Sequence, residues 1–113
     1  MTTKTSALDP IDLYSLMVVE DGRIRRAMVW ERILYLIHIR TAASDGLSAT
    51  GAQLAAAACC CDHSARAAIR MLIESGYVAY VGNGSKRYRH YETTSHGEAL
   101  LSEFRFSFLN VEA

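Results

Sequence analysis

The spacing of apolar residues predicts a short helix at residues 10–20. Asp9 suits the N-cap and Pro10 suits the first helical position, where a missing N–H costs nothing. One face of this helix carries Leu13, Leu16 and Met17. Asp21-Gly22 would then end it.

Residues 23–41 form the most apolar stretch of the chain, and their pattern fits two structures. Helical spacing links Trp30, Ile33, Leu34 and Ile37. Strand-like alternation links Ile33, Tyr35, Ile37 and Ile39. The length of the stretch and its lack of glycine and proline favour one long helix.

An alanine-rich helix is predicted at residues 51–58, after a loop at residues 42–47. Either Ser48 or Thr50 would cap this helix. Its small side chains let a neighbouring helix approach closely, which a tight helical corner requires.

The corner itself is predicted at the adjacent cysteines 59–61. A second helix follows from about residue 62 to residue 75, and Gly76 ends it with a left-handed cap. Residues 77–81 and 86–92 then resemble strands, and the Gly-Asn-Gly-Ser turn at 82–85 joins them in a β-hairpin.

The last predicted element is a helix that begins at Thr94 or Ser95. Helical spacing places four apolar residues on one face of this helix, namely Leu100, Leu101, Phe104 and Phe108. Phe106 falls off this stripe, so the end of the helix is expected to fray, bend or meet a partner.

Composition points to one domain at residues 9–113 behind a polar tail at residues 1–8. Half of the 113 residues are apolar, which suffices for a core without metal or disulfides. The apolar surplus suggests a homodimer. We expect the helices at 9–41 and 95–113 to form the dimer contact around a core at 48–92.

Local charge is more informative than the total, which is zero from 12 basic and 12 acidic residues. Between residues 66 and 91, Glu74 is the single acidic residue. The basic residues of the same stretch are Arg66, Arg70, Lys86, Arg87 and Arg89. Such a cluster is the electrostatic footprint of a nucleic-acid binder.

The order of these elements and several of their residues resemble the winged helix-turn-helix of MarR-like regulators. The matching positions are Leu54-Ala55, Cys60, Leu72, Gly76, Val78, Thr94, Gly97 and Leu100-Leu101. Cys59 occupies the turn position where the family usually has glycine, and Ala58 stands where it often has a larger apolar residue. The resemblance implies an α+β, mostly helical fold with a two-stranded β-wing, flanking terminal helices, and small effectors bound between such helices.

Helical spacing alone identifies the outer face of the helix at 62–75 as the expected DNA-reading surface. The inward face is expected to carry Ala65, Ala68, Ile69 and Leu72, and the outer face carries His63, Arg66, Ala67, Arg70 and Glu74. We expect Arg66 to contact a base and Arg70 to reach a base or a phosphate. Ser64 and the free amides at the helix start suit a phosphate, unless Asp62 caps them.

The hairpin contributes the second part of the expected DNA surface through Lys86, Arg87 and Arg89. On a strand, Arg87 and Arg89 share one face while Tyr88 and His90 share the other. One face can therefore meet the DNA backbone or minor groove while the other packs.

Other functional classes find less support in the sequence. Cys59, Cys60 and Cys61 suggest a thiol switch, but Cys60 is more simply explained as a small buried residue. No second ligand cluster completes a metal site, and no phosphate loop or nucleophile elbow indicates an enzyme or a cofactor. Lacking a signal-like segment or a membrane-length apolar run, the chain is expected in the cytoplasm.

The sequence therefore predicts a homodimeric, double-stranded-DNA-binding transcriptional regulator, a repressor, without catalytic residues. The alternatives are a winged-helix module for protein interaction and an architectural DNA-binding protein of a plasmid or phage.

Overall fold

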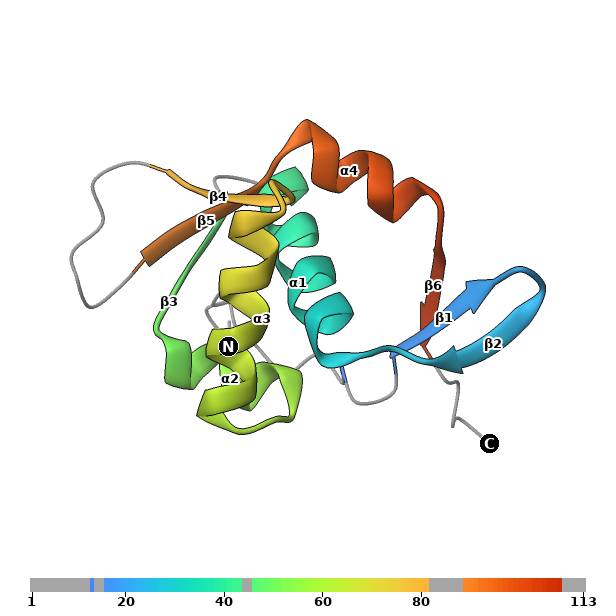
Figure 1. Cartoon of the computed structure of the whole chain (residues 1–113), viewed down its shortest axis with the longest axis horizontal. Helices are drawn as coiled ribbons and strands as arrows, with labels where there is room; N and C mark the ends of the chain where they lie inside the picture. Colours follow the sequence, from blue (N-terminus) through green and yellow to red (C-terminus); the bar gives the residue numbers. More distant parts are fainter. Residues whose placement is uncertain (1–12, 14–15, 44–45, 82–88, 109–113) are drawn as a thin grey trace, which may run out of the picture.

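Helices and antiparallel strands alternate along the chain, which confirms the α+β class (Figure 1). The computed structural model describes residues 13, 16–43, 46–81 and 89–108. Its elements are β1 (Leu16–Glu20), β2 (Arg23–Arg26), α1 (Val29–Ala43), β3 (Leu47–Ala49), α2 (Gly51–Ala58), α3 (Asp62–Glu74), β4 (Val78–Tyr80), β5 (Arg89–Thr93), α4 (Ser95–Ser102) and β6 (Arg105–Phe108). No described helix is long and apolar enough to cross a membrane.

The helix expected at residues 10–20 is wrong, because residues 16–20 form strand β1. Asp21 and Gly22 have positive φ angles of 55° and 78°. Two such residues make the tight turn that matches the twist of a β-hairpin, and they lead β1 into β2. Asp-Gly is thus a hairpin signal here and not a helix stop.

The long helix expected from residue 23 starts six residues later, because residues 23–26 form β2. Helix α1 begins at Val29, where Glu31 Oε1 accepts a hydrogen bond of 2.8 Å from the Met28 amide. A carboxylate in the first turn satisfies an amide that the helix leaves unpaired. The preference for helix over strand is confirmed for residues 29–41.

The chain after α4 is also extended, so the expectation of a helix over 95–113 is wrong beyond Ser102. Strand β6 pairs with β1 and completes sheet A, in the order β2-β1-β6. Phe106, which falls off the predicted helical stripe, packs against Tyr35 of α1 with ring centroids 5.1 Å apart. Residues 109–113 lie outside the described residues.

The predicted hairpin forms sheet B together with a strand that the sequence did not indicate. β4 and β5 pair antiparallel, as expected, and the turn between them lies outside the described residues. β3 pairs with the other edge of β5, in a segment predicted as a loop and a cap. Three residues are too few for a periodic signal, although Leu47 and Ala49 are both fully buried.

Helices α2 and α3 and the turn between them lie where the sequence predicts. Thr50 caps α2 in a reciprocal capping box with Gln53. At the end of α3, Gly76 has a φ of 82°, and the amides of Gly76 and Tyr77 bond to the carbonyls of Ile73 and Leu72. This is the left-handed helix end that glycine favours.

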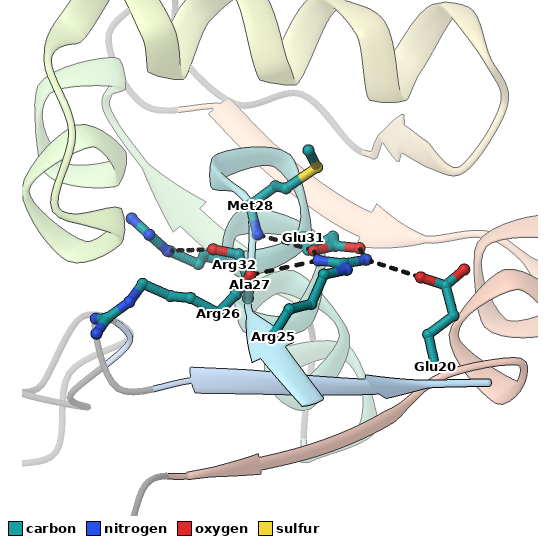
Figure 2. Close-up of polar contacts among 7 residues, drawn as sticks. All are labelled: Glu20, Arg25, Arg26, Ala27, Met28, Glu31 and Arg32. Atoms are coloured by element: carbon teal, nitrogen blue, oxygen red, sulfur yellow. Dashed lines mark hydrogen bonds and ion pairs between the residues drawn. The ribbon is translucent and has the colours of Figure 1, made fainter. Parts of the chain in front are cut away.

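Helix α1 lies between the two sheets and packs against α3 and β5 (Figure 1). Its start carries a buried ionic network (Figure 2). Glu31 is 1% exposed, and both its carboxylate oxygens lie 2.7 Å from the Arg25 guanidinium of β2. Hydrogen bonding to Glu31 raises the pKa of Arg25 above its usual value. The network therefore fixes sheet A onto α1.

Replacing Arg25 by alanine should destabilise the fold, because Glu31 would stay buried without its cationic partner. We expect a loss of about 1–3 kcal/mol in the free energy of unfolding, measured with urea. Arg23→Ala, on the exposed part of the same strand, is the control and should change it by less than about 0.5 kcal/mol. Equal losses in both variants would contradict the role given to Glu31.

The backbone conformation of Cys59 leads to a second prediction about stability. Its backbone is left-handed, at φ 59° and ψ 49°, a conformation that costs a side-chain-bearing residue roughly 1–2 kcal/mol. Since the side chain is exposed, Cys59→Gly should relieve this strain. The greater freedom of glycine in the unfolded chain offsets roughly 0.5–1 kcal/mol of the gain, so Tm should rise by about 2–4 °C in a thermal melt. Cys59→Ala keeps the strain and should leave Tm unchanged. An equal rise in both would assign the effect to the thiol.

Candidate nucleic-acid interface

The outer face of α3 gathers most of the residues expected to contact DNA. His63, Arg66, Ala67 and Arg70 are all exposed, and Ser64 is half-buried. The opposite face is buried, as predicted, through Ala65, Ala68, Ile69 and Leu72. The core thus fixes α3 along its length and leaves the arginine face open.

Buried Arg32 of α1 bonds to the end of α2, where the corner between α2 and α3 begins. Its Nη1 donates to the carbonyl of Ala58, the last residue of α2, at 2.8 Å. Its Nε donates to the Ala27 carbonyl at 3.1 Å (Figure 2). Because Arg32 is buried, its guanidinium serves the fold and not an external ligand.

The amides at the start of α3 are expected from the sequence to suit a phosphate unless Asp62 caps them. Asp62 does not cap them in the structure. Cys61 occupies the N-cap position and makes no side-chain cap hydrogen bond, while Asp62 is the first helical residue. The Cys61 thiol instead lies 3.3 Å from the Ser64 hydroxyl. Hydrogen bonding to Ser64 lowers the pKa of Cys61.

Cys60 behaves as the sequence suggests, since it is half-buried and packs against the core. Burial raises the pKa of its thiol, as expected for a charge that loses water. Within the described residues, no cluster of three or more histidine, cysteine or acidic side chains could hold a metal ion.

Only part of the predicted wing lies within the described residues. Arg89 begins β5, and its backbone is in register with Ala49 of β3. Lys86, Arg87 and the side chain of Arg89 lie outside the described part of the chain. The relation of this basic group to α3 therefore stays a prediction.

A groove of about 480 Å³ lies between α3, the start of α2 and sheet B. The residues that line it include Gly51, Leu54, Arg66, Ile69, Arg70, Ile73, Glu74, Tyr80 and Tyr91. Its volume is in the range of about 300–1,000 Å³ found for ligand sites. Arg66 and Arg70 thus line this groove as well as face outward.

Tyr80 and Gly51 belong to this groove, although the sequence did not single them out. Tyr80 is 51% exposed despite its large ring, which lies 5.4 Å from that of Tyr91. A Cβ on Gly51 would lie 4.0 Å from Cγ and Nε of Arg66. The exposure of Tyr80 is visible only in the structure, because the alternation of side chains along a strand does not tell which face of β4 is buried.

A second cavity of about 310 Å³ lies between α1, α4 and β6. Its lining combines aromatic rings with a histidine and a carboxylate, namely Tyr35, His38, Glu98, Leu101, Ser102 and Phe106. It lies in the region where the resemblance to MarR-like regulators implied an effector.

Comparison with known proteins reveals no relative of this chain. No protein-family model matches the sequence, and no curated protein or solved structure is significantly similar to it. The resemblance to MarR-like regulators therefore stays a prediction.

The environments of the cysteines predict different thiol reactivities. At neutral pH, iodoacetamide should label Cys61 before Cys60, because Cys61 is exposed and its pKa is lowered. Fragment-ion mass spectrometry can locate the label within the triplet. Ser64→Ala should slow labelling of Cys61 severalfold and leave Cys60 unchanged. An unchanged Cys61 rate would mean that the Ser64 contact does not activate it.

Proposed function

We propose that residues 48–92 form a winged helix-turn-helix and that the chain binds double-stranded DNA as a transcriptional regulator. The supporting observation is a pair of exposed arginines on one helix face, in contrast to two arginines that the fold itself uses. Arg25 and Arg32 have their guanidinium groups bonded within the fold. Arg66 and Arg70 are exposed on α3, and neither makes a hydrogen bond or ion pair with another described residue.

Two positive groups on a rigid helix suit a polyanion. Arginines four residues apart form one ridge on a helix, and a helix fits the major groove of B-DNA. The buried face of α3 holds this ridge in place before binding, so the backbone needs little further ordering when DNA binds. The β4–β5 pair beside α3 is suited to the role of the wing, with Lys86, Arg87 and Arg89 on the DNA backbone.

As a regulator, the chain would act as a homodimer and repress by occupying its site. Two recognition helices related by a two-fold axis read half-sites about one helical turn apart. The segments expected to supply the dimer contact, 9–41 and 95–113, contribute sheet A, α1 and α4 to the described structure. In this proposal, the second copy contacts that end of the molecule.

A second candidate, a protein-interaction module, has one observation in its favour. Ile24 of β2 and Met28 before α1 are 67% and 55% exposed. Large apolar side chains left in water are typical of contact surfaces. Under this alternative, substitution of the α3 arginines would leave binding to the partner protein unchanged.

DNA binding is tested by fluorescence anisotropy with a random-sequence duplex at low and moderate salt. The wild-type affinity should fall steeply with salt. The double variant Arg66→Ala/Arg70→Ala should bind roughly tenfold more weakly or worse. Its salt slope should be smaller by about one for each phosphate that the missing arginines no longer neutralise.

The matched control is the double variant Arg66→Lys/Arg70→Lys, which keeps both positive charges on the exposed face of α3. It should bind like the wild type. The proposal is wrong if the wild type does not bind, if binding is independent of salt, or if Arg66→Lys/Arg70→Lys weakens binding as much as the double alanine variant.

A further inference from the structure

The two arginines of α3 occupy different places on its exposed face. At 3.6 residues per turn, Arg70 and His63 lie in the middle of the exposed arc, while Arg66 lies toward the flank that carries half-buried Ile73. The 4.0 Å approach to Gly51 agrees, because it places the Arg66 stem beside the first residue of α2. Arg66 is therefore directed toward the groove more than outward.

The groove combines an apolar floor with polar edges. Leu54 and Ile69 are buried beneath it, whereas Arg66 and Arg70 stand on the α3 wall and Tyr80 on the sheet B wall. The capping box engages the amides of Thr50 and Gln53 at the start of α2, and the side chains of Arg66, Arg70 and Tyr80 place donor groups on the two walls. Such a surface suits a ligand with alternating apolar and anionic parts.

A sugar–phosphate strand has this alternation, since apolar deoxyribose faces separate its phosphates. The charge distribution also limits where a phosphate fits. Glu74 lies at the end of the groove farther along α3, and its carboxylate repels a phosphate there. Arg66 and Arg70 attract one nearer the start of the helix.

We propose that this groove holds one sugar–phosphate strand of the bound DNA, with Arg66 and Tyr80 donating to its phosphates from opposite walls. Arg70 and His63 then face the base edges. This inference rests on the proposed function and reverses the expectation that Arg66 contacts a base.

The roles are separated by selecting bound sequences from a random DNA pool with the full chain and with single variants. Arg66→Ala should weaken binding roughly tenfold on every sequence and leave the selected consensus unchanged. Arg70→Ala should lose the preference at one or two positions of each half-site. Tyr80→Phe should weaken all sequences severalfold without changing the salt slope, because a hydroxyl carries no charge.

Neutral methylphosphonate linkages, placed one at a time in the selected site, then locate the phosphate. For Arg66→Ala and for Tyr80→Phe, there should be a linkage at which the substitution causes no further loss of affinity, because the phosphate charge that the side chain contacts is already gone. Tyr35→Phe, between α1 and β6, is the control for removal of a tyrosine hydroxyl and should bind like the wild type. Thermal melts of each variant verify folding, and Arg66→Gln replaces Arg66→Ala if the latter unfolds.

The outcomes separate the two proposals. If the wild-type chain selects no DNA, the proposed function and this inference both fail. If it binds DNA but Arg66→Ala alters the consensus, or Tyr80→Phe has no effect, the inference alone fails. The inference also fails if both variants still weaken binding at every methylphosphonate linkage.

Discussion

The buried carboxylate of Glu31 connects parts of the fold that the chain builds separately. It accepts two hydrogen bonds from Arg25 and one from the Met28 amide, so one side chain fixes the β1–β2 hairpin and the start of α1 together (Figure 2). The next residue, Arg32, extends the connection to the end of α2. Because a buried charge is tolerated only when it is fully bonded, this network admits one arrangement of hairpin, α1 and helical corner. The orientation of α3 therefore depends on residues that never approach its exposed face.

A second set of constraints controls where α3 begins and ends. The left-handed backbone at Cys59 turns the chain out of α2, and the left-handed Gly76 turns it out of α3 toward β4. Thr94, which follows β5, is bonded to this point, since its hydroxyl donates to the Gly76 carbonyl while accepting from the Gly97 amide. Gly97 allows that contact, because a Cβ there would collide with the Tyr77 carbonyl. The helix and sheet walls of the groove are thus held together by the Thr94 hydroxyl and by the close approach of Gly97 to Tyr77.

The distance along the chain between contacting residues explains which parts of the structure could be predicted from sequence. Caps, glycines and helical spacing are local signals. They predict α2 and α3 nearly to the residue, and they predict the pairing of β4 with β5, which is described from Arg89. Sheet A depends on β6 pairing with β1 from the other end of the chain, and no local pattern records such a partner. Asp21-Gly22 carries a local hairpin signal, which the helical spacing of Leu13, Leu16 and Met17 obscures. In the candidate site, the exposed arginines follow from spacing, but the half-exposure of Tyr80 follows only from how α3 packs on sheet B.

The neutral net charge conceals a difference in role among the arginines. Arg25 of β2 is paired with the buried Glu31 carboxylate, which offsets its charge. Arg32 of α1 is buried and donates to backbone carbonyls within the fold. The arginines of α3 have no such internal partner among the described residues and face solvent at the edge of a groove. The same residue type is therefore structural where it meets an acceptor inside the fold and available where it does not.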